Sequence, residues 1–311
     1  MTDQTALVVA EGTSAQEAAD NVGQAQSMSQ EAWRELRRNP LFVISLALIT
    51  LFLVMAIFPQ LFTSTDPNKA VLRLSNTGPS ADQWFGRDRQ GYDVYARTIY
   101  GARASIIVGL ATTIITGLIG VIVGTLAAYY GGIFDTLVMR LTDVFFAIPF
   151  LLGGILFMST FPNKVDSSYF SVVAKVVLAL SLLGWPSIAR LMRGAVLQVK
   201  PNDYVQAARA LGASPWRVIR NHILPNAIAP VMVVSMINLG AYIAAEASLS
   251  FLGIGLVSPA ISWGVAISDS LNLIRTAPWI LIFPSIFLSL AVLAFIMLGD
   301  AVRDAFDPKG R

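Results

Sequence analysis

The chain has 311 residues, of which 55% are hydrophobic and 13% charged, and its mean hydropathy is +0.64, which is too apolar for an ordinary soluble domain and indicates a polytopic membrane protein. The net charge of +3 is small, and the arginines are scattered between apolar segments, so nucleic-acid binding has little support. The absence of cysteine excludes disulfides and thiolate chemistry, and with His222 as the only histidine a histidine-rich metal site has no basis.

Residues 1–30 are rich in Ala, Gln, Ser, Glu and Thr and lack a basic start followed by an apolar core, so they are not a signal peptide. We expect them to form a disordered cytoplasmic tail. Residues 33–40, WRELRRNP, form a basic amphipathic turn directly before an apolar run. Such a turn is typical of a cytoplasmic membrane anchor under the positive-inside rule.

Six apolar segments follow, each long enough for about 20 helical residues to cross a hydrocarbon core of roughly 30 Å. Basic residues cluster before the first segment, between the fourth and fifth, and after the last, which an even number of spans places on one side. The sequence therefore predicts an all-α membrane protein with six transmembrane helices and cytoplasmic termini. The predicted spans are 41–62, 104–130, 138–159, 171–192, 227–251 and 279–302.

The predicted spans and basic clusters divide the chain into four parts. Residues 1–30 are the tail, and 31–103 hold the first span and an extracytoplasmic loop. Residues 104–302 form a transmembrane core that contains a polar segment at 202–226, and 303–311 form a second cytoplasmic tail.

The loop at 63–103 carries six basic residues although the span count places it outside, and we expect a loop with an interfacial helix. Its stretch 86–93, GRDRQGYD, has the Asp and Gly spacing of a cation loop. It lacks a bidentate glutamate at the right distance and contains two arginines. A pair of glycine turns capped by aspartate side chains is the favoured interpretation.

Several residues inside the predicted spans are unusual for their position. Gly117, Gly120 and Gly124 fall near one helix face and predict a seam for close helix packing. Asp143 can pair locally with Arg140 at the entry to the third span, which Pro149 should kink.

Glu246 and Asn238 share a similar face of the fifth span, where a carboxylate is costly to expose to lipid. Both residues could lie on a translocation path. Alternatively, Glu246 could brace neighbouring helices by hydrogen bonding. The sequence leaves both interpretations open.

The segment 202–226, NDYVQAARALGASPWRVIRNHILPN, predicts two short amphipathic helices. Asn202 and Asp203 begin the first, and Gly212 ends it. Ser214 with Pro215 begins the second, which we expect to run to about Ile223 before Pro225 breaks it. One face carries Tyr204, Val205, Ala208 and Leu211 on the first helix and Trp216, Ile219 and Ile223 on the second, with Arg209, Arg217 and Arg220 on the other side.

Such a hairpin could lie in the lipid headgroups or dock in a groove of another protein. The segment resembles the EAA loop of the membrane subunits of ABC importers, with Ala207, Ala208, Gly212, Leu224 and Pro225 at the matching spacing. Two positions depart from that pattern: Gln206 replaces the glutamate, and His222 stands at the isoleucine position. The ending HILPN and the stretch WFGRDRQGYDVYARTIYGAR resemble the dipeptide and oligopeptide (DppC/OppC-like) branch.

The resemblance, which runs from about Trp33 to Arg311, implies a type I ABC importer permease fold in the inner membrane. It implies a second homologous permease, two cytoplasmic ATPases that bind ATP and Mg, and an extracytoplasmic substrate-binding protein. It also implies that the segment 202–226 is a coupling loop that docks on an ATPase. The coupling residues would be Tyr204, Gln206, Ala207, Ala208, Arg209, Gly212, Ala213, Trp216, Arg217, His222, Leu224 and Pro225.

No phosphate-loop pattern of the Gly-x-x-x-x-Gly-Lys-Ser/Thr type occurs in the sequence, so ATP hydrolysis would belong to partner subunits and this chain would need no cofactor of its own. Members of this family also carry nickel complexes, haem and other small solutes, so the substrate stays open. A different class, an ion-coupled secondary carrier, would rely on the intramembrane acids Asp143, Glu246 and Asp300. A lipid-facing scaffold would leave the spacing of the 202–226 motif unexplained.

Overall fold

The computed structural model describes residues 36–164 and 166–306, and the regular elements in these ranges are helices. The tail at 1–30, the start of the basic turn at Trp33 and Arg34, and residues 307–311 lie outside the described part. Five described helices are long and apolar enough to cross a membrane, and a sixth crossing is reached if one bent helix pair counts as a single span. These five helices are α3 (Pro40–Ile57), α4 (Val94–Tyr130), α7 (Tyr169–Val199), α11 (Ala229–Phe251) and α13 (Trp279–Phe306).

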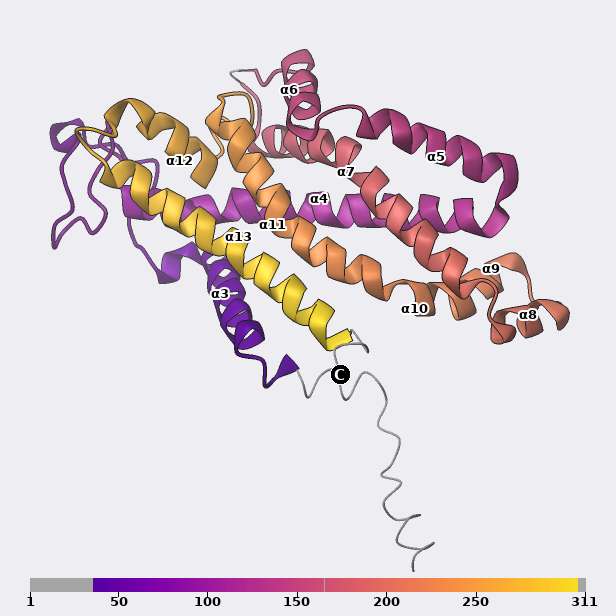
Figure 1. The fold of residues 1–311 in the computed structure, drawn as a ribbon. Coiled ribbons are helices and arrows are strands. Elements are labelled where there is room, and N and C mark those ends of the chain that lie inside the picture. Colours follow the sequence, from indigo (N-terminus) through magenta and orange to yellow (C-terminus); the bar gives the residue numbers. More distant parts are fainter. Residues whose placement is uncertain (1–35, 165, 307–311) are drawn as a thin grey trace, which may run out of the picture.

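Helix α4 starts well before its predicted beginning at residue 104. Asp93 caps it, because its carboxylate accepts a hydrogen bond of 2.9 Å from the amide of Ala96. The helix ends at Gly131, which has a φ of 69°. With 37 residues, α4 extends along most of the bundle and touches elements at both of its ends (Figure 1).

The third predicted span, 138–159, is broken rather than kinked. It consists of α5 (Gly132–Phe146) and α6 (Phe150–Thr160), whose axes differ by 84°. The break lies at Pro149, as the sequence indicated, because proline lacks the amide that would continue the helix and disfavours the helical region for the preceding Ile148. The predicted change of direction at Pro149 is therefore present, and it is a full break between two helices.

The predicted glycine seam is confirmed at two of its three positions. A Cβ added to Gly120 would lie 2.6 Å from Cβ of Ile188 on α7, and one added to Gly124 would meet the backbone of Ala189. Gly117 has open space around it and contributes nothing to the seam. Small residues therefore bring α4 and α7 into close contact at the centre of the bundle.

At one end of the molecule, loops at 58–93 lie beside the short helix α12 (Trp263–Ser270) (Figure 1). Trp263 is fully buried there, and its indole donates a hydrogen bond of 2.9 Å to the carbonyl of Thr98 on α4. Three single-turn helices, η1 (Pro59–Leu61), η2 (Leu72–Leu74) and η4 (Leu271–Leu273), complete this end.

The stretch 86–93 forms the predicted glycine turns. Gly86 and Gly91 have φ values of 72° and 81°, and Asp88 Oδ1 accepts hydrogen bonds of 2.9 Å from the amides of Gln90 and Tyr92. Burial raises the pKa of Asp88, and these amide bonds and the charge of Arg97 act against that rise. The aspartates of this loop thus bind the main chain, as the turn interpretation expects.

The opposite end of the molecule is formed by residues 202–226, which we call the elbow (Figure 1). Its elements are α8 (Asp203–Ala210), α9 (Pro215–Val218), the π-helical turn η3 (Ile219–Ile223) and α10 (Leu224–Ala227), which leads directly into α11.

Candidate coupling elbow and central cavity

The first arm of the elbow ends as the sequence predicts. Gly212 has a φ of 80°, a conformation that favours glycine. The amide of Gly212 donates to the carbonyl of Arg209 at 2.9 Å, and the amide of Ala213 donates to that of Ala208 at 3.0 Å. This pair of bonds is a Schellman motif, which fixes the direction in which the chain leaves α8.

The second arm begins as predicted but does not stop at Pro225. Ser214 accepts the amide of Arg217 at 3.4 Å, and Pro215 occupies the first helical position. The amide of Leu224 then bonds to the carbonyl of Ile219, five residues earlier, so the helix widens into the π register just before the proline. Pro225 consequently sits in the first turn of α10, where a missing amide costs nothing.

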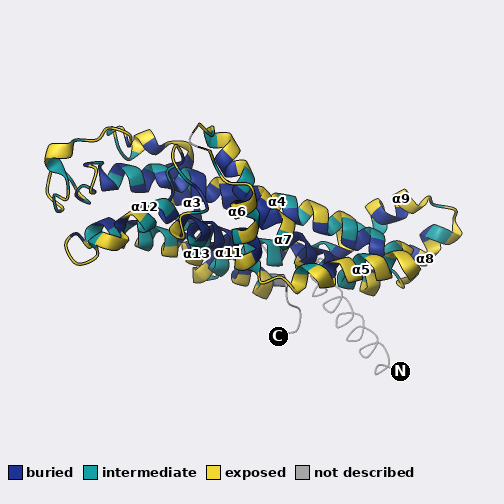
Figure 2. Cartoon of the chain, turned by 90° about the horizontal axis from the view of Figure 1, so that it is seen from above, coloured by how far each residue is buried: buried dark blue, intermediate teal, exposed yellow. Residues whose placement is uncertain are grey.

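The structure divides the apolar side chains of the elbow into a buried set and an exposed set. Val205 and Ile223 are fully buried, and Ala208 is nearly so. They form one cluster with Met192 and Val196 of α7. The elbow is thereby packed firmly against the bundle, as the dark residues of its inner face show (Figure 2).

The exposed set forms the tip of the elbow. Leu211 is 88% exposed, Trp216 is 68% exposed and Tyr204 is 43% exposed. The predicted single apolar face is therefore divided, because these three residues are exposed while Val205, Ala208, Ile219 and Ile223 are buried. Among the remaining expected coupling residues, those exposed are Gln206, Ala207, Gly212, Arg217 and Pro225, and those partly buried are Arg209, Ala213, His222 and Leu224.

Lys200, at the junction of α7 and the elbow, joins three elements. Its ammonium group donates to the carbonyls of Ala128 and Tyr129 at the end of α4, at 2.9 and 2.8 Å. Its own carbonyl accepts a bond of 3.0 Å from Nε2 of Gln206. Burial lowers the pKa of Lys200, and the nearby charge of Arg209 acts in the same direction.

Arg209 departs from the expected polar side of the elbow. Its guanidinium lies 5.0 Å from the ring centre of Tyr129, so it stacks on the end of α4. Arg217 and Arg220 are exposed, as predicted. The polar side of the elbow therefore contains one arginine that holds the bundle and two that face outward.

Two arginines of α7 attach α5 to the bundle. Arg193 makes two hydrogen bonds of 2.6 Å to the carboxylate of Asp135. Arg190 pairs with Asp143, donates to Thr142 at 3.1 Å and stacks on Phe146 at 4.2 Å. The predicted local partner of Asp143, Arg140, lies 3.8 Å away and is mostly exposed, so the cross-helix partner is the closer one.

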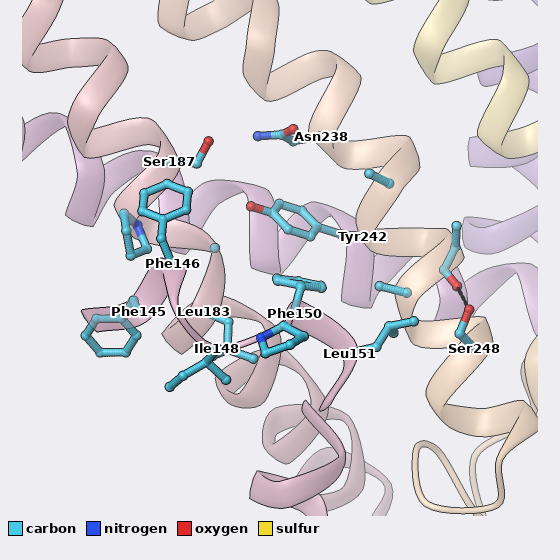
Figure 3. A pocket seen from close by; sticks show the side chains of 16 residues that line it. Phe145, Phe146, Ile148, Phe150, Leu151, Leu183, Ser187, Asn238, Tyr242 and Ser248 are labelled. Atoms are coloured by element: carbon cyan, nitrogen blue, oxygen red, sulfur yellow. Dashed lines mark hydrogen bonds between the residues drawn. The ribbon is translucent and has the colours of Figure 1, made fainter. Parts of the chain in front are cut away.

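A cavity of about 590 Å³ opens where α5 and α6 break, between α7 and α11 (Figure 3). Its wall is largely aromatic and aliphatic, and Asn238, Ser187 and Tyr242 point polar atoms toward it. The break at Pro149 brings aromatic residues of α5 and α6 to the rim, since the two helices diverge there. Other lining residues are Phe145, Phe146, Ile148, Phe150, Leu151, Leu183 and Ser248.

Comparison with known proteins matches the sequence to a transport family. Residues 120–311 match the model described as "Binding-protein-dependent transport system inner membrane component", and residues 27–79 match the N-terminal TM domain of oligopeptide transport permease C. The chain is 40% identical over 286 residues to the dipeptide transport system permease protein DppC of Bacillus subtilis, covering 92% of this chain and 87% of the relative.

The chain belongs to the binding-protein-dependent transport system inner membrane component family.

A second relative of this permease is the oligopeptide transport system permease protein OppC of Bacillus subtilis, 37% identical over 301 residues, with 94% of this chain and 96% of the relative covered. A solved structure of the MetNI methionine ABC transporter in inward-facing conformations is similar with a TM-score of 0.48 and 21% identity, covering 65% of this chain and 94% of that chain. Family membership makes the chain a multi-pass membrane subunit of a transport system and favours the importer interpretation over an ion-coupled carrier.

Glu246 of the permease is fully buried and lies away from the cavity that Asn238 lines. Its carboxylate accepts hydrogen bonds from Ser105 on α4 at 2.9 Å, from Ser250 on α11 at 2.7 Å and from Ser262 at 3.0 Å. The structure therefore separates the two residues that the sequence placed on a similar helix face.

Sequence reasoning missed two parts of this site. Lys200 was counted only in a basic cluster, and its partners Ala128 and Tyr129 are 72 and 71 positions away, beyond any local pattern. The cavity was also missed, although Pro149 was a signal for the helix break that forms its rim.

Proposed function

We propose that this chain is the transmembrane permease subunit of an ATP-driven importer of dipeptides or oligopeptides, and that it couples to cytoplasmic ATPases through the elbow. The observation that carries this proposal is the exposed apolar tip, with Leu211 88% and Trp216 68% exposed on an elbow whose inner face is packed against the bundle. Exposed apolar patches with a polar rim are typical of protein interaction sites, and here Arg217 and Arg220 lie beside the patch.

The orientation follows from charge. Lys200, Arg209, Arg217 and Arg220 concentrate at the elbow, and the positive-inside rule assigns such a cluster to the cytoplasm. With α5 and α6 counted as one broken span, the proposed topology has six crossings and both termini on that side of the inner (cytoplasmic) membrane. The loop at 63–93 and α12 then face the exterior.

The family supports an assembly of several chains. A second homologous permease would complete the translocation pathway, of which this chain forms half. Two ATPases would bind ATP and Mg, an extracytoplasmic binding protein would deliver the substrate, and this chain would bind no cofactor. The cavity beside Asn238 is the proposed wall of the pathway, because it is concave, mainly apolar and supplied with a few polar groups.

The proposed mechanism is mechanical. Closure of the ATPase pair moves the elbow, and the arms of the elbow pass that displacement to the bundle. The first arm continues from α7, and the second is continuous with α11 through η3 and α10. A rigid-body movement of these helices alternates access to the pathway.

The substrate class is inferred from relatives. Besides the dipeptide and oligopeptide permeases, a glutathione transport system permease protein GsiD of Pectobacterium atrosepticum is 36% identical over 281 residues, covering 90% of this chain and 91% of the relative. All three names describe peptides or a peptide-like compound. Uptake of labelled dipeptides, with nickel complexes and haem as competitors, would separate the peptide assignment from the alternatives.

Crosslinking tests the docking step, because the chain has no cysteine of its own. Leu211→Cys at the tip is expected to crosslink to an ATPase carrying a single cysteine in its facing groove. Leu72→Cys is the matched control, since it is similarly exposed (75%) but lies at the opposite end of the molecule. A crosslink from the tip to lipid-attached probes only would reject the proposal in favour of the headgroup interpretation. A crosslink from Leu72→Cys to the ATPase would reject the proposed orientation.

A bulky substitution at Gly212 tests the same step in transport. Gly212→Trp is expected to abolish peptide uptake while membrane insertion continues, because it adds bulk at the tip and forces a side chain into a φ of 80°. Gly117→Trp is the control, because Gly117 also has open space around it but lies mid-helix. Unchanged uptake in Gly212→Trp would contradict the proposal.

A further inference from the structure

We propose that Lys200 is a positioning residue for transport: its ammonium group fastens the elbow to the end of α4, so that displacement of the elbow reaches the far end of the bundle along that helix. This inference rests on the proposed function, since it assumes that the elbow receives the ATPase stroke.

The geometry around Lys200 is that of a fastener with two attachments. Its side chain binds the last carbonyls of α4, at Ala128 and Tyr129, and its main-chain carbonyl binds Gln206 on α8. One residue thus holds the end of α4 with its side chain and the first arm of the elbow with its backbone. Arg209 adds a second attachment of the same arm by stacking on Tyr129.

A cation suits this position for physical reasons. The last carbonyls of a helix lack intrahelical partners and carry the negative end of the helix dipole. A lysine has three donors, and Lys200 uses two of them on neighbouring carbonyls of α4. The contact is therefore charge-assisted and resists separation of the elbow from α4.

Helix α4 is suited to carry the displacement. It contains 37 residues, and it is packed without a gap against α7 at Gly120 and Gly124. At its other end, the carbonyl of Thr98 binds Trp263 of α12. Movement of the α4 terminus at Lys200 thus has a continuous path of contacts to α12.

A role in positioning predicts a specific loss. The test uses the complete complex, with its ATPases, second permease and binding protein in proteoliposomes, and measures dipeptide uptake per ATP hydrolysed. Lys200→Met is expected to lower this ratio about tenfold, within the 5- to 150-fold range of typical coupling effects. Lys200→Arg should restore most of it, because a guanidinium can also donate to two carbonyls.

Lys175 provides the matched control. Its ammonium also donates to a carbonyl, that of Pro162 at 2.9 Å, but near the start of α7 and far from the elbow. Lys175→Met is expected to leave uptake per ATP unchanged. An equal fall in both variants would mean that lysine-to-carbonyl bonds act on stability alone and would overturn the proposal.

Gln206→Ala is the second test variant, for the case in which the Lys200→Met complex does not assemble. Gln206 is exposed, so its truncation leaves the buried cluster intact while removing the bond to Lys200. It should lower the ratio about threefold, and a wild-type ratio in Gln206→Ala overturns the proposal when Lys200→Met cannot be purified.

The Leu211→Cys crosslink separates the two levels of inference. An intact crosslink with a wild-type ratio in Lys200→Met rejects the role of Lys200 alone. Absence of the crosslink in a permease that carries only Leu211→Cys rejects the proposed function itself.

Discussion

Ser262 donates a hydrogen bond of 3.0 Å to Glu246, and its own oxygen accepts the amide of Val265 at 3.2 Å, so the N-terminal cap of α12 is tied to the C-terminal part of α11. Ser250 is arranged in the same way: it donates to Glu246 at 2.7 Å and accepts the amide of Leu256 at 2.9 Å. Glu246 thereby connects α11 to α12 and to the loop that precedes it. We propose that it is an interhelical brace rather than part of the pathway.

Glu246→Gln should be tolerated. Ser250 and Ser262 donate to Oε1 of Glu246, and the amide oxygen of glutamine can accept both of these bonds. Ser105 donates to Oε2, and in the variant its hydroxyl oxygen can instead accept a bond from the amide nitrogen of glutamine. We expect assembly and peptide uptake within about twofold of the wild type. The measurements are uptake in proteoliposomes and the yield of purified complex.

Glu246→Leu is the contrasting variant, because leucine leaves the buried hydroxyls of Ser105, Ser250 and Ser262 without their hydrogen-bond acceptor. Each unsatisfied group costs about 1–3 kcal/mol, so the midpoint of thermal unfolding should fall clearly. A strong loss of uptake in a well-assembled Glu246→Gln complex would instead indicate that the charge acts on the pathway.

Gly120→Ala should destabilise the permease, because its new methyl group would lie 2.6 Å from Ile188 and force α4 away from α7. Overpacking of this kind costs about 1–3 kcal/mol. Gly117→Ala, with nothing within 4 Å of its added Cβ, is the matched control and should be neutral or slightly stabilising. Equal thermal stability of the two variants would contradict the close packing of α4 on α7.

The pair of Asp135 and Arg193 should contribute measurably to holding α5 on α7. A double-mutant cycle with Asp135→Asn and Arg193→Gln, read by unfolding in SDS, is expected to give a coupling energy of about 1 kcal/mol, because the bonds are bidentate and partly buried.

The pair of Arg140 and Asp143 is the comparison for that cycle. Its atoms are 3.8 Å apart and its side chains are 81% and 52% exposed, so its coupling should be about 0–0.5 kcal/mol. Similar coupling in both cycles would show that the cross-helix pair has no special role in attaching α5.

Features governed by neighbouring residues were predictable from the sequence. Gly212 ends α8, Ser214 and Pro215 begin α9, and the glycines of 86–93 form turns capped by aspartate, all as the local patterns indicated. Each of these predictions depends on backbone preferences that act within a few residues.

Features governed by distant partners were not predictable in the same way. Leu211 and Trp216 have apolar spacing that suits a buried face, yet the neighbouring Val205 and Val218 occupy the contact with α7 and leave them outside. The two prolines also differ in outcome, because Pro149 separates two helices whereas Pro225 follows a π turn that removes the need for its amide. Neither outcome is encoded in the proline itself.

The π turn η3 takes up one residue more than an α-helical turn between Ile219 and Leu224 would need. Because the wider turn absorbs this extra residue, α9 and α10 keep nearly the same relative orientation that a continuous α-helix would give them. Removing one residue between Ile219 and Ile223 would return the segment to the α register and set the ring of Pro225 against the carbonyl four positions earlier. Chain length at this one turn therefore decides whether the second arm of the elbow can run past its proline into α11.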